Sequence, residues 1–131
     1  MSNLVETMEN WLAAFNSGDL DTYLSYYHDD VELYGYAPQV MRRDEVRGYY
    51  ERFLSAFEFR SVADETIWDG ERVAIRFTAN ALQTAPFDGI EPSGKWVSWP
   101  VQSILHWEDG KIRRRYSLQD MEQVHHALAA R

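Results

Sequence analysis

The spacing of apolar residues changes once along this 131-residue chain, and this change restricts the fold more than any other feature. Up to about residue 57, apolar residues recur at helical spacing, whereas from residue 58 they occupy alternate positions. Two Asp-Gly pairs, at 69–70 and 109–110, interrupt the alternating half and are typical of tight hairpin turns. The sequence therefore predicts an α+β fold in which helices come first and cover one face of an antiparallel sheet.

Helices make up most of the first half in this prediction. A first helix ends near Gly18, Asp19 caps a short second helix that extends to Tyr27, and a third helix runs over about 44–57. A short strand is expected at 31–34 and a loop at 35–42. The second half is expected to form four strands (59–68, 72–83, 95–108 and 111–119), a loop at 85–94 and a final helix at about 121–129.

The composition excludes several classes of function. The chain has no cysteine, which removes disulfides, thiolate nucleophiles and cysteine-bound zinc. Its formal charge of -8 argues against nucleic acid as a partner, because phosphate backbones would be repelled. No apolar run approaches the ~18 residues of a membrane span, and the acidic start does not resemble a signal peptide. We therefore expect a single-domain, cytoplasmic protein over residues 1–131 that has no membrane partner.

Alternation within the strands predicts which side chains face the helices. In the second long strand the odd residues are apolar, so Phe77 and, at the end of the strand, Gln83 are expected to point inward. In the last strand the even residues are the more apolar set, and extending this set reaches Asp120. A two-residue turn at the second Asp-Gly pair then places Trp99 opposite Asp120. The inner face is therefore expected to be apolar with a few polar groups.

These polar groups of the expected inner face are Gln83, Arg114, Tyr116 and Asp120. A charged carboxylate in such a place is costly unless it is paired or faces a cavity. Asp120 is then either structural, as a partner of Arg114 or a cap of the last helix, or part of a pocket. The pocket interpretation predicts a cavity for a small apolar organic ligand, lined by Tyr34, Tyr49, Phe53, Phe77, Trp99 and Tyr116.

Several motifs of the chain match one family pattern. They are Ser93–Val97, the run Ile104–Ile112 that ends in Glu-Asp-Gly-Lys-Ile, Gly70–Ala74, and Tyr116–Asp120, where an aromatic residue precedes an aspartate by four positions. With these motifs the chain resembles the SnoaL-like polyketide cyclases over nearly its whole length. The resemblance implies the nuclear-transport-factor-2-like fold, a cone-shaped α+β fold whose curved antiparallel sheet wraps around N-terminal helices.

The resemblance also implies a chemistry. In the polyketide cyclases, the aspartate that matches Asp120 is the general acid/base of an intramolecular aldol closure. Gln83 stands where that family has a pocket histidine, Tyr116 where it has a tryptophan, and Arg114 where a glutamate is frequent. The implied function is proton transfer on a bulky apolar carbonyl compound by a cyclase, isomerase or dehydratase, with Gln83 and Tyr116 able to hydrogen-bond an enolate oxygen.

The sequence is also compatible with other functions. One is a non-catalytic small-molecule binding protein of the same fold, and another is an interaction module with a filled core. A third is an epoxide-hydrolase-like enzyme, in which Arg114 and Asp120 would supply part of an Asp-Arg-Asp arrangement. The four histidines show no metal-ligand spacing, so no metal is expected. The chain has no Gly-rich phosphate loop, and no organic cofactor is expected either. Trp96, Ile104 and His106 are expected on the outer sheet face, where they predict a homodimer packed through the sheets.

Overall fold

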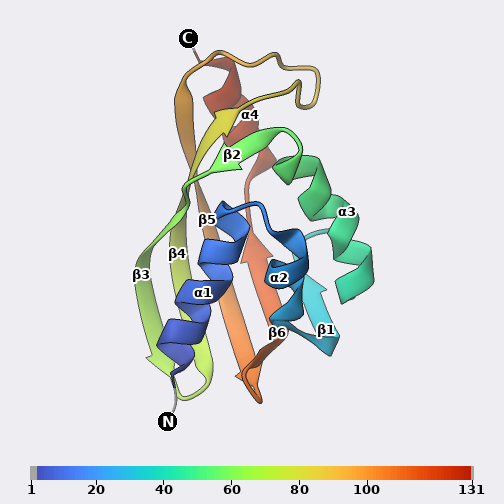
Figure 1. Ribbon diagram of the computed structural model, residues 1–131, viewed down its shortest axis with the longest axis vertical. Coiled ribbons are helices and arrows are strands. Elements are labelled where there is room, and N and C mark those ends of the chain that lie inside the picture. Colours follow the sequence, from blue (N-terminus) through green and yellow to red (C-terminus); the bar gives the residue numbers. More distant parts are fainter. Residues whose placement is uncertain (1–2, 131) are drawn as a thin grey trace.

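The computed structural model describes residues 3–130, which form four helices and six strands (Figure 1). Their bounds are α1 Leu4–Asn16, α2 Leu20–Ser25, β1 Tyr27–Tyr34, α3 Arg43–Leu54, β2 Phe57–Phe59, β3 Val62–Asp69, β4 Arg72–Gln83, β5 Trp96–Glu108, β6 Lys111–Leu118 and α4 Met121–Ala129. The expected α+β fold is confirmed: helices α1 to α3 cover the inner face of a curled sheet, and α4 packs against β5 (Figure 1). In the described part of the chain, no helix has the length and apolar character needed to cross a membrane.

The sheet is more mixed than the alternation predicted. Its order is β1-β6-β5-β4, with β2 and β3 pairing to different halves of β4. Strand β1 runs parallel to β6 and begins at Tyr27, which the sequence pattern had placed in the second helix. The single strand expected at 59–68 is interrupted because the Asn16 side chain binds both backbone groups of Ser61, at 2.8 and 2.9 Å. Ser61 therefore has no free backbone group for a strand partner.

Two apolar clusters fill the space between helices and sheet. One lies under α1 and α2 and contains Trp11 and Leu105, and the other lies near α4 and contains Phe57 and Trp99. Three half-buried side chains pack against both clusters, namely Phe15, Tyr49 and Val101. These three side chains mark the place where the two clusters meet and where the cavity described below is found.

The β5–β6 hairpin contains a bulge that the sequence did not predict. The two-residue turn is present, with positive φ at Asp109 and Gly110, and Trp107 pairs with Ile112 as expected. The register then shifts by one residue, so that Leu105 pairs with Arg115. Because neighbouring residues of a strand point to opposite faces, this shift reverses the inward and outward sets in the rest of β6.

The predicted orientation of the last strand is therefore wrong. Arg114, Tyr116 and Asp120 do not point to the helices, and the residues next to them in sequence do. The inner side chains of this segment are Arg115, Ser117 and Gln119. The face predicted for β4 agrees with the structure, since the odd residues from Val73 to Gln83 are buried.

Candidate functional site

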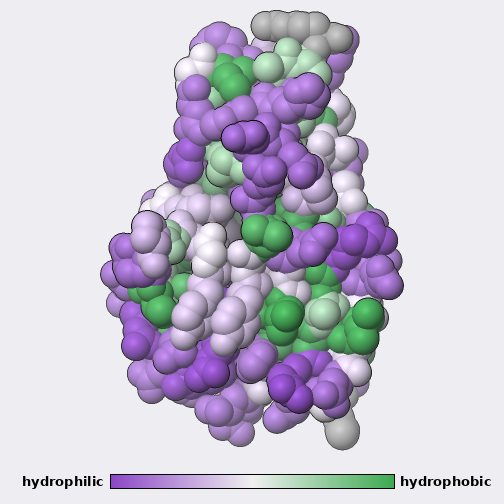
Figure 2. Space-filling view, turned by 180° about the vertical axis from the view of Figure 1, so that it is seen from behind, coloured by the Kyte–Doolittle hydropathy of each residue, from purple (hydrophilic) through white to green (hydrophobic). Residues whose placement is uncertain are grey.

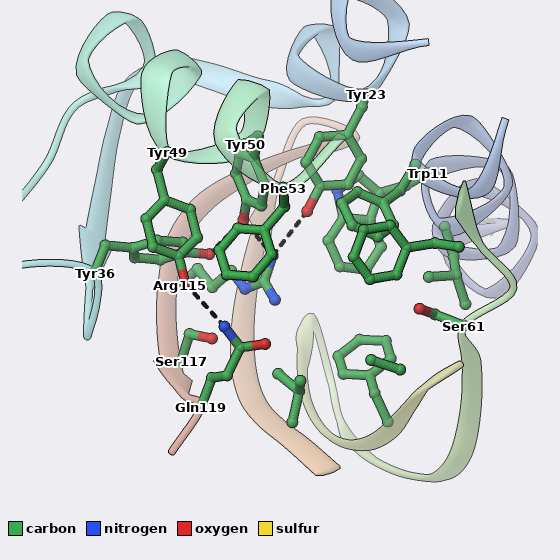
Figure 3. A pocket seen from close by; sticks show the side chains of 16 residues that line it. Trp11, Tyr23, Tyr36, Tyr49, Tyr50, Phe53, Ser61, Arg115, Ser117 and Gln119 are labelled. Atoms are coloured by element: carbon green, nitrogen blue, oxygen red, sulfur yellow. Dashed lines mark hydrogen bonds between the residues drawn. The ribbon is translucent and has the colours of Figure 1, made fainter. Parts of the chain in front are cut away.

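A cavity of about 80 Å³ lies between helices α1–α3 and the inner face of the sheet (Figure 3). Helices contribute most of its aromatic side chains, and strands β4 to β6 contribute residues at alternate positions. The lining consists of Trp11, Leu12, Phe15, Tyr23, Tyr36, Tyr49, Tyr50, Phe53, Phe59, Ser61, Phe77, Ala79, Val101, Arg115, Ser117 and Gln119. Among these residues there is no carboxylate and no histidine, and the one charged group is Arg115.

Helical spacing explains why these rings converge. Trp11 and Phe15 are four residues apart in α1, and Tyr49 and Phe53 are four apart in α3, so each pair lies on one helix face. Tyr50 is next to Tyr49 in α3 and points toward the same cavity beside it (Figure 3). The helices thus supply flat apolar walls, while the sheet supplies the polar groups.

Arg115 is held by hydroxyl groups from four elements. Its side chain is buried, and its Nη1 donates to the hydroxyls of Tyr27, Tyr23 and Tyr50 at 2.8, 2.9 and 3.0 Å. Its Nε and Nη2 both donate to Ser103 Oγ, at 3.2 and 3.1 Å. The tyrosines come from α2, β1 and α3, and the serine comes from β5. The guanidinium therefore has a fixed position at one side of the cavity (Figure 3).

Two aromatic rings also contact the guanidinium. Its central carbon lies 5.2 Å from the ring centre of Trp11 and 5.8 Å from that of Tyr36. A cation over an aromatic face is attracted by the negative charge of the π-system. These rings partly replace the water that the cation loses on burial.

The charge of Arg115 is not neutralised by any acid of the described residues. No carboxylate of residues 3–130 forms an ion pair with it, whereas the neighbouring Arg114 pairs with Glu32 at 3.0 Å on the exterior. Burial raises the pKa of Tyr23, Tyr36 and Tyr50, and the nearby guanidinium only partly opposes this effect. These phenols stay protonated at neutral pH, so the cavity carries one uncompensated positive charge.

Gln119 connects the cavity to the second apolar cluster. Its Nε2 donates to the Tyr49 hydroxyl at 3.0 Å, and its Oε1 accepts from Trp99 Nε1 at 2.9 Å. Because an indole nitrogen only donates, this contact fixes the orientation of the amide. Burial raises the pKa of Tyr49, so its hydroxyl is a neutral donor beside the cavity.

The structure brings some of the sequence-predicted site residues together. Tyr49, Phe53 and Phe77 line the cavity. Trp99 is buried in the neighbouring cluster, where it contacts the lining residues Gln119, by a hydrogen bond, and Phe59, by an edge-to-face ring contact. Gln83 is buried on the inner face, where its amide donates to the carbonyls of Ala85 and Ile90 at 2.9 and 2.6 Å. Gln83 therefore holds the 84–95 loop and does not face the cavity.

The other predicted site residues lie outside the cavity. Tyr34 and Tyr116 stack on each other with ring centres 4.7 Å apart. Asp120 is exposed, and its carboxylate accepts from the Glu122 backbone N–H at 2.9 Å. Of the two structural interpretations of Asp120, the cap of the last helix is confirmed, whereas Arg114 pairs with Glu32 and not with Asp120.

The sequence contained a signal for the missed arginine. Arg113, Arg114 and Arg115 are consecutive in a strand, so any regular register directs at least one of them inward. Alternation alone could not identify which one, because the bulge decides it. The tyrosine cluster was harder to find, since Tyr23, Tyr27 and Tyr50 come from three separate elements.

A curled sheet that encloses an aromatic cavity together with its N-terminal helices defines the nuclear-transport-factor-2-like class of α+β folds. Within this class, the model of the SnoaL-like domain family matches residues 8–115. The chain belongs to this family, which confirms the resemblance found in the sequence. Among curated protein sequences, none matches the chain significantly.

Solved structures share this fold at low sequence identity. IdmH from Streptomyces antibioticus, a proposed polyketide cyclase, is 21% identical with a TM-score of 0.86, and the match covers 98% of this chain and 100% of that chain. AclR from Streptomyces galilaeus, a proposed hydroxylase, is 24% identical with a TM-score of 0.85, covering 95% and 94%. TsrD from Streptomyces laurentii is 27% identical with a TM-score of 0.77, covering 96% and 94%.

Proposed function

We propose that this chain binds a compact, mostly apolar organic compound in the cavity, with an oxygen function of that compound facing Arg115. One observation carries the proposal: an aromatic cavity contains a single charged group, and that group is rich in hydrogen-bond donors. Apolar walls with a few convergent polar groups are the usual composition of a small-molecule site. SnoaL-like relatives described as polyketide cyclases support a carbonyl compound as the ligand.

The size of the cavity supports a compact ligand over the bulky one expected from the sequence. Its volume of about 80 Å³ is below the roughly 150 Å³ of an engineered cavity that admits benzene. Pockets for drug-sized compounds have roughly 300 Å³ or more. A polycyclic compound therefore requires that half-buried lining side chains such as Tyr36 and Tyr49 move outward.

Catalysis by cyclisation or isomerisation is a second candidate. It is favoured by the tight cluster of Arg115 and phenol donors, which would stabilise negative charge that develops on an enolate oxygen. No carboxylate or histidine in the described lining can remove the proton, so the base would come from the substrate or from water. An epoxide-hydrolase-like reaction has less support, because it needs a carboxylate that activates water.

A cavity-filling variant tests the binding function. Ala79 lines the cavity and Ala74 is exposed on the opposite face of the same strand, so the two positions form a matched pair. We expect Ala79→Leu to abolish the binding of small ketones, measured by chemical-shift perturbation, and Ala74→Leu to leave it unchanged. Ketones that bind equally well to both variants would disprove a cavity-bound ligand.

We also propose a homodimer that packs through the outer sheet face. Exposed apolar side chains there include Ile67, Ile104 and Leu118, which are 64%, 46% and 68% accessible. Figure 2 shows apolar groups among polar ones on the side opposite the view of Figure 1. Light scattering that detects only a 15.4 kDa species at micromolar concentration would contradict the dimer.

A further inference from the structure

The polar end of the cavity has more hydrogen-bond donors than acceptors. Nη2 of Arg115 carries two hydrogens, and only one of them has an acceptor within residues 3–130, namely Ser103 Oγ. The hydroxyls of Tyr23 and Tyr27 share one hydrogen bond at 3.0 Å. This pair therefore leaves one hydroxyl hydrogen without an acceptor in the described part of the chain.

The next pair of phenols adds to this excess. Tyr36 and Tyr50 share one hydrogen bond at 2.6 Å, and again one of their two hydrogens has no acceptor in the described residues. The Tyr49 hydroxyl accepts from Gln119, and its own hydrogen likewise has no described acceptor. Buried donors without acceptors are rare in folded proteins because each one costs free energy. The excess therefore indicates that acceptor atoms are supplied from outside the chain.

The charge balance points in the same direction. Arg115 is always protonated, and it has no acidic partner among the described residues. A buried cation without a counter-ion is costly, while a ligand that brings one negative charge removes this cost. A ligand with two charges would find only one cation in the lining. The missing partner therefore carries one negative charge and several acceptor positions.

We infer that the ligand is a carboxylate anion of a compact carbon skeleton, and this inference rests on the proposed binding function. Its carboxylate would accept from the free N–H of Arg115 Nη2 and from the hydroxyls of Tyr23 and Tyr50, which meet at one side of the cavity (Figure 3). Its carbon skeleton would contact the aromatic walls formed by Phe53 and Phe77. A guanidinium–carboxylate contact is a strong, charge-assisted hydrogen bond, and burial strengthens it further.

Matched acids and amides test this inference. We would titrate the full chain with acetate and isobutyrate, which suit the small cavity, and with acetamide and isobutyramide, which have the same shapes without the charge. We expect each acid to bind at least about tenfold more tightly than its amide. We expect Arg115→Met to weaken acid binding by about 30-fold or more and to remove the preference for acids.

Arg114→Met is the matched control, because Arg114 is an exterior arginine of the same strand that pairs with Glu32. This variant should retain both the affinity for acids and the preference over amides. Tyr50→Phe is a second variant that removes one hydroxyl and keeps the guanidinium. It should weaken acids by severalfold and leave amides nearly unchanged, so the inference remains testable even if Arg115→Met fails to fold.

The outcomes separate this inference from the proposed function. If acids and amides bind equally well, and Arg115→Met changes neither, the carboxylate inference is wrong while cavity binding stands. If neither series shifts the resonances of cavity residues up to the solubility limit, both proposals are wrong. If acids bind but Arg114→Met weakens them as much as Arg115→Met does, the anion binds outside the cavity and the inference fails.

Discussion

Replacing Arg115 by methionine removes the buried charge and keeps most of the volume of the side chain. Four N–H groups of Arg115 bond hydroxyls, and hydrogen bonds to a charged group contribute about 1.5–3 kcal/mol each. The opposing cost of burying a cation without a counter-ion is several kcal/mol.

These two contributions oppose each other, and replacing a buried ion by an apolar side chain of similar volume is often close to neutral. We therefore expect Arg115→Met to change the free energy of unfolding by no more than about 2 kcal/mol. The phenols keep partners in the variant, because the Tyr23–Tyr27 and Tyr36–Tyr50 hydrogen bonds do not depend on the guanidinium. Urea denaturation with linear extrapolation measures the change, provided that the m-values of variant and wild type agree.

A loss of about 4 kcal/mol or more would refute this reasoning. That value is typical of breaking a buried, satisfied charge pair, and it would show that Arg115 is needed to hold the elements around it together. Arg114→Met provides the reference for removing an exterior arginine and should cost about 1 kcal/mol or less. A bound acid should also stabilise the wild type by about 2.7 kcal/mol at one hundred times its dissociation constant, and should stabilise Arg115→Met by about 0.9 kcal/mol or less at the same concentration.

Four further predictions concern positions outside the cavity. Gly35 has φ of 95°, and a Cβ there would lie 1.9 Å from the Ser117 carbonyl oxygen. Gly35→Ala should therefore lower the free energy of unfolding by on the order of 3 kcal/mol, as measured by thermal denaturation. Gly48 lies in α3 with open space around it, and Gly48→Ala should instead stabilise by up to about 1 kcal/mol. Asp120→Ala should lower the free energy of unfolding by about 1 kcal/mol through loss of the helix cap. Asp120→Asn should change neither stability nor ligand affinity by much, and a large loss of affinity in this variant would indicate a role of Asp120 in binding. Hydrogen bonds from an arginine of α3 and a histidine of α4 lower the pKa of Asp88. The ionised Asp88 carboxylate therefore stabilises the folded state fully above the unfolded pKa of about 3.9, and this stabilisation disappears as pH falls through the lower folded pKa. Asp88→Asn should reduce this pH dependence of stability, as measured in acid titrations.

The sequence was sufficient for most of the fold because local patterns determine it. Asp109-Gly110 forms the expected turn, and the apolar residues of β4 are buried on the expected face. The sequence pattern was insufficient to predict the inward face of β6, because both sets of alternate residues in this strand contain polar and apolar side chains. Leu118 is 68% exposed and Tyr116 is also exposed, whereas Ile112 is buried, so the more apolar set of this strand faces outward only beyond the bulge. Tyr27 was misassigned for a different reason: its strand is formed by pairing with β6, far away in the sequence.

The bulge in the last hairpin bears on how sites of this kind can change during evolution. A substitution alters one side chain, whereas gaining or losing one residue at the bulge exchanges every side chain that β6 presents to the cavity. In the register present here, the cavity receives a cation and two neutral polar groups. The opposite register of the same strand would present Arg114 and Tyr116 to the cavity, together with Asp120, which belongs to the same alternate set. A lineage can therefore move between a cavity that contains a cation alone and one that contains a cation beside a carboxylate in one mutational step, while the helices, the turn and the rest of the sheet stay the same.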